Sequence, residues 1–423
     1  MSRLEYKKLK YLTTKIGSGA TPTGGQSAYK LNGISLIRSQ NVLDLSFSSD
    51  GLAFIDELQA KKLDNVEVKE NDILLNITGD SIARVCKVPK EILPARVNQH
   101  VSILRSNGDI DPNYLLYYLI NKKKYLLTIS RVGGTRNALT KEAIENLDIK
   151  IDINQEKIAS VLSALDDKIE LNNRINAELE AMAKKLYDYW FVQFDFPNSP
   201  PLEGWQNSKN FDGVVGYKSS GGKMVYNETL KREIPEGWEV KNLFEVCNVQ
   251  YGFPFSTEYF NEIGNGIPVI RIRDVIENSV SNYSTEKNID SKYEILKGDL
   301  LIGMDGNFHI NYWTKNNCYL NQRVVKLTEK ELPNIYLRYQ IEPYIKAREA
   351  SVSRTTVGHL SDKDLKAINI LVPPKEIKLK IRKIYNDVLI KIITNKEQNQ
   401  KLSALRDWLL PMLMNGQVKV QEN

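Results

Sequence analysis

Several short runs of polar side chains along the chain combine guanidinium and carboxamide groups. Arg38, Gln40 and Asn41 directly follow one apolar run, and Asn98 with Gln99 interrupts another. A guanidinium matches the acceptor edge of guanine, and a carboxamide matches the donor–acceptor edge of adenine. These residue types in loops therefore favour hydrogen-bonded recognition of bases, although a solvated loop explains each run taken singly.

The candidate base-contacting residues fall into two sets, one in each half of the chain. The first set comprises Arg38, Gln40, Asn41, Thr78, Arg84, Asn98, Gln99, His100, Thr135 and Arg136. The second set comprises Arg271, Arg273, Asn307, His309, Asn321, Gln322, Arg323, Arg354 and Thr355. Positions that differ between the sets, such as His100 and Arg323, are the better specificity candidates, because two readers need different bases. The shared Asn98 and Asn321 are more typical of a scaffold.

Both sets lie within an internal repeat. The recurring pairs are Ile34 and Ile267, Ile37 and Ile270, Arg38 and Arg271, Val42 and Val275, Asp72 and Asp299, Leu74 and Leu301, Gly79 and Gly306, Asn98 and Asn321, and Gln99 and Gln322. A repeated unit of about 200 residues far exceeds the roughly 20–50 residues of a solenoid repeat. The sequence therefore predicts two whole domains, and two similar readers suit an object with two-fold character such as a DNA duplex. Gly79 and Gly306 are expected to permit a backbone turn.

Composition sets broad limits on the class of protein. The chain has 423 residues, 42% hydrophobic and 26% charged, with a formal net charge of +6, which suits two or three globular domains. The positive charge is compatible with a nucleic-acid partner but only weakly indicative of one. No apolar run approaches the roughly 18 residues of a membrane span, and the N-terminal segment lacks the apolar core of a signal peptide. We therefore expect a cytoplasmic protein.

Catalytic and cofactor-binding motifs are missing from the sequence. Its 3 cysteines are odd in number and its 3 histidines are isolated, so neither a disulfide framework nor a zinc site is expected. There is no G-x-x-x-x-G-K-[ST] loop, no G-x-G-x-x-G after a strand and no G-x-S-x-G elbow. We therefore expect this chain to hold no metal and no cofactor of its own.

Strand and helix signals place the candidate residues in an α+β fold. Residues 1–152 and 234–374 each show short β-type runs separated by turn residues, followed by a helix-like segment that opens at Pro112 or Pro333. We predict two pseudo-repeated mixed α/β domains over these two ranges. Residues 197–233, dense in Pro, Gly, Ser and Asn, are expected to form a connector.

A long heptad pattern follows each domain, within residues 153–196 and 375–423. Its seam positions include Leu165, Ile169, Asn172, Asn176 and Leu179 in the first helix, and Val388, Ile392, Asn395, Asn399 and Leu402 in the second. The seams either pack on their own domains or pair with each other as an antiparallel coiled coil. Pairing is favoured because asparagines on a seam fix its register, and because the first helix is net acidic and the second net basic. Only Arg406 breaks the character of the second seam.

Several segments, in this order, resemble the specificity subunit of type I restriction–modification systems. They are GSGATPTGG at 17–25, VNQHV at 97–101, IPEGWEVKNLFEV at 234–246, NQRVV at 321–325 and KLSALRDWLLPMLMNGQVKV at 401–420. Each is weak alone, but together they span nearly the whole chain. The lead into each long helix departs from the family pattern, since no proline precedes residues 153–157 and the second copy lacks the glutamine. These departures bear on the helix starts rather than on DNA reading.

The resemblance implies a non-catalytic subunit that reads double-stranded DNA. Each domain would read one half of a bipartite site, and the helix pair would dock two adenine-N6 methyltransferase subunits and the restriction subunits. S-adenosylmethionine, ATP and Mg²⁺ would belong to those partners, and no membrane would be involved. A helix over residues 154–191 would extend roughly 57 Å at about 1.5 Å per residue. Such a helix can hold two readers about one to one-and-a-half duplex turns apart, given about 34–36 Å per turn, and so would set the spacer.

Two other classes of function stay open at this point. A stand-alone two-lobed DNA nuclease or methyltransferase would need a carboxylate cluster or a cofactor loop. Asp72 and Asp299 are instead expected to be turn residues, because each lies just before a strand, where aspartate is common. A protein–protein scaffold built on the helix pair would not bind duplex DNA in a salt-sensitive way.

Overall fold

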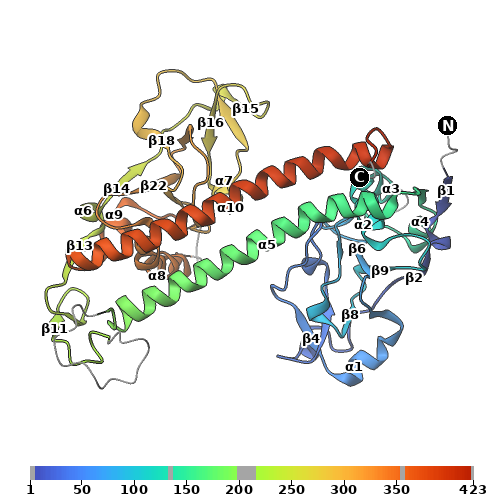
Figure 1. Cartoon of the computed structure of the whole chain (residues 1–423), viewed down its shortest axis with the longest axis horizontal. Coiled ribbons are helices and arrows are strands. Elements are labelled where there is room, and N and C mark those ends of the chain that lie inside the picture. The colour runs from blue at the N-terminus through green and yellow to red at the C-terminus, as the bar shows by residue number, and fades with distance from the viewer. Residues whose placement is uncertain (1–4, 132–136, 198–215, 353–357, 421–423) are drawn as a thin grey trace. The chain divides into compact units, whose positions relative to one another are not determined.

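The computed structural model describes residues 5–131, 137–197, 216–352 and 358–420. The chain divides into two compact units, Met1–Glu170 with Gln400–Asn423 (unit 1) and Leu171–Asn399 (unit 2). Two long helices, α5 (Gln155–Tyr187) and α10 (Lys375–Asn415), each contribute one part to each unit (Figure 1). No helix within the described ranges is long and apolar enough to cross a membrane.

Unit 1 contains two four-stranded sheets and one two-stranded sheet. Their strand orders are β2-β9-β6-β7, β4-β3-β8-β5 and β1-β10. The bounds are β1 (Glu5–Lys8), β2 (Thr13–Ser18), β3 (Ile34–Ile37), β4 (Ala53–Ile55), β5 (Glu67–Val68), β6 (Ile73–Asn76), β7 (Val85–Lys87), β8 (Ala95–Val97), β9 (Val101–Ser106) and β10 (Asp148–Ile151). The shorter helices are α1 (Glu57–Lys62), α2 (Pro112–Asn121), α3 (Lys123–Ile129) and α4 (Lys141–Glu145).

Unit 2 repeats this plan with a four-stranded and a five-stranded sheet. Their strand orders are β14-β22-β19-β20 and β15-β17-β16-β21-β18, and β13 pairs with β23 as β1 pairs with β10. The bounds are β13 (Glu239–Asn242), β14 (Cys247–Tyr251), β15 (Phe260–Asn261), β16 (Ile267–Ile270), β17 (Asn282–Ser284), β18 (Glu294–Ile295), β19 (Leu300–Gly303), β20 (Ile310–Tyr312), β21 (Cys318–Leu320), β22 (Val324–Glu329) and β23 (Asn369–Val372). The helices are α6 (Leu243–Val246), α7 (Ile272–Glu277), α8 (Asn334–Val352) and α9 (Asp362–Lys366), and β11 (Met224–Asn227) with β12 (Arg232–Pro235) forms a hairpin. The matching strand orders confirm the repeat of two mixed α/β domains that the sequence predicts.

The helix-like segments of the two repeats differ in one respect. In unit 1 the segment forms two helices, α2 and α3, that meet at Lys122, whereas in unit 2 the single helix α8 continues through Pro343. Pro112 occupies the first turn of α2, and the Asp111 side chain accepts the backbone N–H of Tyr114 at 2.8 Å. The predicted start at a proline is therefore correct, because a first-turn proline has no N–H to leave unpaired.

The long helices contact each other within each unit, in antiparallel order. In unit 2, Asn172 Nδ2 donates to Asn399 Oδ1 at 2.8 Å, and Asn395 Nδ2 donates to Asn176 Oδ1 at 2.8 Å. In unit 1, the Arg406 guanidinium lies 2.5 Å from the Asp166 carboxylate. Every seam residue named above is buried or half-buried.

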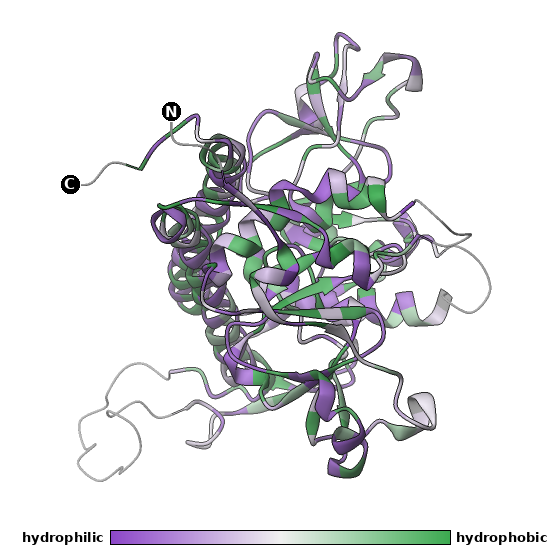
Figure 2. Cartoon of the chain, turned by 90° about the vertical axis from the view of Figure 1, so that its right-hand side faces the viewer, coloured by the Kyte–Doolittle hydropathy of each residue, from purple (hydrophilic) through white to green (hydrophobic). Residues whose placement is uncertain are grey.

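The helices also pack on the sheets of their own units, so the two packing alternatives from the sequence both occur. In unit 1 the core includes Ile158 of α5 and Leu413 of α10, and in unit 2 it includes Tyr187 of α5 and Tyr385 of α10. A second, separate cluster lies around Trp313 in unit 2. Hydrophilic and hydrophobic residues are interspersed along the strands and helices, as expected where one face of an element is buried (Figure 2).

Candidate nucleic-acid interface

In each unit, one pair of parallel strands brings two candidate segments to the same edge of a sheet. β3 pairs in parallel with β8 in unit 1, and β16 pairs in parallel with β21 in unit 2. Arg38 and Asn98 follow the first pair of strands, and Arg271 and Asn321 follow the second. Because parallel strands end at the same edge, residues distant in sequence meet there, as they do at the ligand crevices of other sheets with parallel strands.

A turn between two antiparallel strands adds a third segment to each edge. The β6–β7 turn carries Gly79 in unit 1, and the β19–β20 turn carries Gly306 in unit 2. Their φ angles are 75° and 70°, which lie in the left-handed region that glycine adopts at little cost. The predicted role of these glycines in a backbone turn is confirmed.

In unit 2 the three segments line a cavity of about 610 Å³. Its lining consists of Phe255, Thr257, Phe260, Arg271, Ile272, Arg273, Ile276, Asp305, Asn307, His309, Asn321, Gln322 and Arg323. Every second-set candidate within the described ranges lies in this lining. Three arginines face a single aspartate, so the cavity is electropositive, the sign that suits a nucleic acid.

Two of the cavity arginines share one buried acceptor. Arg271 Nη1 and Arg273 Nη2 donate to Asn282 Oδ1 at 2.7 and 2.6 Å, and Asn282 is 5% exposed. This contact holds both guanidinium groups side by side at the cavity wall. The sequence did not point to Asn282, because its role depends on the pairing of β17 with β16, which no local pattern reveals.

The third cavity arginine belongs to a charged group centred on Asp305. The Asp305 carboxylate lies 3.1 Å from Arg323 Nη1 and 2.6 Å from His359 Nδ1. The Arg323 side chain is 56% exposed, against 24% for Asp305, so the guanidinium reaches outward from a more buried anchor. His359 was not among the sequence candidates, because it is isolated from the other histidines in the sequence. A backbone bridge between residues 305 and 359 brings it next to Asp305.

In unit 1 the corresponding segments form a hydrogen-bonded network around His100. The hydroxyl of Thr78 lies 2.5 Å from His100 Nδ1, and Gln99 Nε2 lies 2.9 Å from His100 Nε2. Both ring nitrogens of His100 therefore have a hydrogen-bond partner within the loop segments. The structure thus brings together three first-set candidates.

Arg38 and Gln40 are held by a neighbouring loop. The Arg38 guanidinium donates to the Gly51 carbonyl and lies 5.3 Å from the centre of the Tyr29 ring. Gln40 Nε2 lies 3.4 Å from the carbonyl oxygens of Asp50 and Gly51. Gln40 is exposed and Arg38 is half-buried, so these contacts orient side chains that still reach the surface.

Three of the candidates are buried and contact the backbone of their own loops. Asn41 is fully buried and its Nδ2 donates to the Ser48 carbonyl at 2.9 Å, so its side chain holds the loop, and its contact with a base stays a prediction. Asn98 and Asn321 are 8% and 7% exposed. Each Oδ1 accepts the backbone N–H two residues further along the chain, at 3.0 and 3.5 Å. Their carboxamides therefore shape the turn, because the backbone N–H is an obligatory donor.

The remaining candidates are less constrained by the structure. Arg84 is half-buried on the β6–β7 turn. Thr135, Arg136, Arg354 and Thr355 lie outside the described residues.

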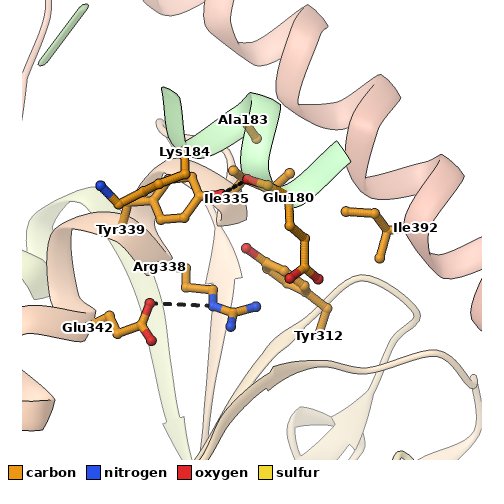
Figure 3. A pocket seen from close by; sticks show the side chains of 9 residues that line it. All are labelled: Glu180, Ala183, Lys184, Tyr312, Ile335, Arg338, Tyr339, Glu342 and Ile392. Atoms are coloured by element: carbon orange, nitrogen blue, oxygen red, sulfur yellow. Dashed lines mark hydrogen bonds and ion pairs between the residues drawn. The ribbon is translucent and has the colours of Figure 1, made fainter. Parts of the chain in front are cut away.

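A second cavity of unit 2, of about 230 Å³, involves none of the base-contacting candidates. It is lined by Glu180, Ala183, Lys184, Tyr312, Ile335, Arg338, Tyr339, Glu342 and Ile392 (Figure 3). The Arg338 guanidinium lies 5.1 Å from the centre of the Tyr312 ring and 3.8 Å from the Glu342 carboxylate. Tyr339 Oη donates to the Glu180 carbonyl of α5 at 3.1 Å. The Tyr339 contact joins α8 to α5, and the Arg338–Tyr312 contact joins α8 to β20.

The described part of the chain contains buried cysteine thiols of low reactivity and no cluster of metal-binding side chains. Burial raises the pKa of the Cys86 and Cys247 thiols to about 12, and the thiolate is the reactive form of cysteine. Among the described residues, no group of three or more His, Cys, Asp or Glu side chains could hold a metal ion.

Each of the two repeated domains gathers polar side chains at the edge where its parallel strands end. This arrangement is typical of a protein with two similar recognition sites. Residues 5–181 and 235–404 match the type I restriction modification DNA specificity domain. The chain belongs to this family of type I restriction–modification specificity subunits.

Known relatives agree with this assignment. The specificity subunit of the type I restriction enzyme MjaIX from Methanocaldococcus jannaschii is 28% identical over 349 residues, covering 78% of this chain and 74% of that protein. The HindI specificity subunit from Haemophilus influenzae is 24% identical over 434 residues, covering 90% and 94%. The crystal structure of a type I S subunit from M. genitalium has a TM-score of 0.53 at 16% identity, covering 97% and 96%, and supports the fold. The predicted family and fold class are confirmed, and the stand-alone nuclease or methyltransferase is not supported.

Proposed function

We propose that this chain is the non-catalytic DNA-reading subunit of a cytoplasmic type I restriction–modification complex. The domain at residues 1–152 reads one half of a bipartite site in double-stranded DNA, and the domain at residues 234–374 reads the other half. Two adenine-N6 methyltransferase subunits and the restriction subunits dock on the long helices. S-adenosylmethionine, ATP and Mg²⁺ act in those partners.

The observation that carries the proposal is the electropositive cavity of unit 2. It gathers Arg271 and Arg273 from the segment after β16 and Arg323 from the segment after β21. The equivalent segments converge in unit 1, where Gln40 and His100 occupy the positions of Arg273 and Arg323. Two domains with the same backbone arrangement and different side chains are suited to two different half-sites, since direct readout depends on side-chain donors and acceptors.

The helix contacts support a role for the helix pair in setting the spacer. The asparagine pairs Asn172–Asn399 and Asn176–Asn395 are interhelical hydrogen bonds within unit 2. Polar pairs on a seam cost stability but fix its register and orientation. Inserting one heptad into each long helix should lengthen the spacer and leave both half-sites unchanged. A spacer that stays the same in this variant would contradict the role.

The main test is to co-express the chain with its neighbouring methyltransferase gene and map N6-methyladenine by single-molecule sequencing. We expect methylation at one bipartite motif that disappears when this chain is deleted. Replacing Arg271 with alanine should relax one half of the motif. Lys330→Ala is the matched control, because Lys330 lies beyond the far end of β22, roughly 20 Å from Arg323 at about 3.3 Å per residue.

Methylation that ignores this chain, or that falls on a continuous motif, would refute the proposal. A protein–protein scaffold would then be the better explanation. In that case the purified chain would fail to bind duplex DNA with the steep salt dependence of phosphate contacts.

A further inference from the structure

The two repeats place an interacting pair of side chains at equivalent positions but build it from different residues. Thr78 and Asp305 each lie directly before the turn glycine of their repeat, and His100 and Arg323 each lie two residues after the buried asparagine. In unit 1 the Thr78 hydroxyl contacts His100 Nδ1 at 2.5 Å. In unit 2 the Asp305 carboxylate contacts Arg323 Nη1 at 3.1 Å. Both members of the pair therefore differ between the repeats, while their contact persists.

The backbone that holds each pair is the same in both units. The N–H of Ile77 donates to the His100 carbonyl at 3.0 Å, and the N–H of Met304 donates to the Arg323 carbonyl at 2.9 Å. The backbone N–H of His100 donates to Asn98 Oδ1, and the backbone N–H of Arg323 donates to Asn321 Oδ1. Differences between the pairs thus lie in the side chains alone.

The pair in unit 2 has the chemistry of a guanine reader. Asp305 contacts Arg323 through Nη1, and a guanidinium carries five N–H donors, so donors remain for an external partner. Arg323 is exposed and lines the electropositive cavity. Two parallel N–H groups of arginine match O6 and N7 of guanine in the major groove.

The pair in unit 1 has a different pattern of donors and acceptors. Thr78 engages one ring nitrogen of His100 and Gln99 engages the other. This network offers a hydroxyl and a carboxamide beside a half-buried imidazole, without a guanidinium. A base edge that suits Arg323 therefore does not suit His100, because the numbers and positions of the donors differ.

We infer that Asp305–Arg323 and Thr78–His100 are equivalent two-residue specificity elements, each of which reads one base pair of its own half-site. Arg323 contacts guanine, and Asp305 is a positioning residue that orients it. The inference rests on the proposed function and deepens it. Each element acts as a unit, because exchanging Arg323 alone leaves the half-buried Asp305 carboxylate with His359 as its remaining side-chain partner among the described residues.

The test uses the whole chain co-expressed with its methyltransferase gene, with methylation mapped base by base. Arg323→Ala should lower discrimination at one base pair of one half-site by on the order of 10- to 100-fold, the range for a bidentate contact. Asp305→Asn should relax the same base pair by a smaller factor, since the side chain keeps its shape but loses its charge. A merely structural Asp305 would not act on a single base pair. Lys330→Ala should leave the motif unchanged.

The decisive variants exchange the elements. D305T/R323H should change the preferred base at that one position, and T78D/H100R should introduce a guanine preference into the other half-site. Either exchange supports the inference if the remaining bases and the spacer stay the same. Hydrogen exchange of each variant checks that its unit is folded, and a variant that does not fold leaves the opposite exchange to decide.

Two results would overturn the inference and leave the proposed function standing. One is a folded R323A variant that methylates the unchanged motif with unchanged discrimination. The other is a uniform weakening at every position, which is the behaviour of a phosphate contact. Methylation that is independent of this chain would refute the proposed function itself, so the two failures are distinguishable.

Discussion

The two repeats bury an aspartate at the same position but give it different partners. In unit 1 the fully buried Asp72 carboxylate accepts Arg105 Nε at 2.7 Å and Nη2 at 2.8 Å. In unit 2 the Asp299 carboxylate accepts the Thr328 hydroxyl at 2.9 Å, and Lys326 Nζ lies 3.8 Å from it. Arg105 and Thr328 lie in equivalent strands, β9 and β22.

Both aspartates accept a hydrogen bond from a backbone N–H three residues earlier in the chain. The Asp72 carboxylate accepts the Lys69 N–H at 2.7 Å, and the Asp299 carboxylate accepts the Leu296 N–H at 2.8 Å, so the predicted turn function is confirmed. Burial raises the pKa of Asp299, and the Leu296 N–H, Lys326 and the Thr328 hydroxyl offset this only in part. A turn contact is thus retained in both repeats, while the compensation of the buried charge differs. The pairs Thr78–His100 and Asp305–Arg323 show the same combination of a shared backbone and different side-chain partners.

The largest expected effect comes from breaking the ion pair of unit 1. Arg105→Met leaves the Asp72 carboxylate buried without its partner, which should lower the free energy of unfolding of unit 1 by about 3–5 kcal/mol. Denaturant titration followed by hydrogen exchange of each unit measures this. Lys90→Met is the control, because its ion pair with Glu70 is exposed and should contribute less than about 1 kcal/mol. Equal effects of the two substitutions would contradict the comparison.

The next effect concerns the helix contacts of unit 1. Asp166 accepts Arg406 Nη1 at 2.5 Å and the Tyr117 hydroxyl at 2.6 Å, which explains the charged residue on an otherwise uncharged seam. The equivalent positions in unit 2 are the buried Ala183 and Leu389. Arg406→Ala should therefore cost about 1.5–3 kcal/mol, as for a hydrogen bond to a charged group.

A double variant sharpens this comparison of the helix contacts. D166L/R406L makes the layer apolar, as in unit 2, and should be more stable than R406A, since no unpaired charge stays buried, while the Tyr117 hydroxyl loses its acceptor in the double variant. A double variant that is less stable than R406A would show that unit 1 needs the charges. Thermal unfolding of the three proteins is a sufficient measurement.

A smaller effect is expected from the hydroxyl beside Asp299. Thr328→Val removes one hydrogen bond to the carboxylate and keeps the shape of the side chain, so unit 2 should lose about 1 kcal/mol. Thr328→Ser should retain most of the stability, because it keeps the hydroxyl. Urea unfolding read from the buried Trp313 in unit 2 separates the two. A serine variant as unstable as the valine variant would assign the loss to packing instead.

The smallest effect is a change in the pH dependence of unit 2. Because the pKa of Asp299 is raised in the folded protein, the folded state holds its proton at pH values where the unfolded chain, with an ordinary pKa of about 3.9, has released it. Stability from this group therefore falls as pH rises from about 4 through the raised pKa. Asp299→Asn should remove that fall, as measured by the difference in unfolding free energy between variant and wild type across pH. Asp72→Asn should instead destabilise unit 1 at neutral pH, since Arg105 loses its anionic partner.

The predictable part of the fold and the site follows from local patterns. Alternating and apolar runs indicated the strands, Pro112 indicated a helix start, and the heptad spacing indicated seams that the structure buries. Candidate residues chosen by chemical type converged on one cavity in unit 2. Asn41 was chosen by the same criterion and is buried, because residue type alone does not distinguish a side chain that serves the loop from one that serves a ligand.

The sequence by itself determined the duplication, the family, the order of strands and helices and the seams of the long helices. These features arise from residue type and spacing, which are local. The tertiary structure alone decided that Asp305 orients Arg323, that Asn282 receives two arginines and that Arg406 pairs with Asp166. Those contacts join segments that strand pairing and helix packing bring together, and burial and hydrogen-bond geometry depend on such neighbours rather than on the adjacent residues.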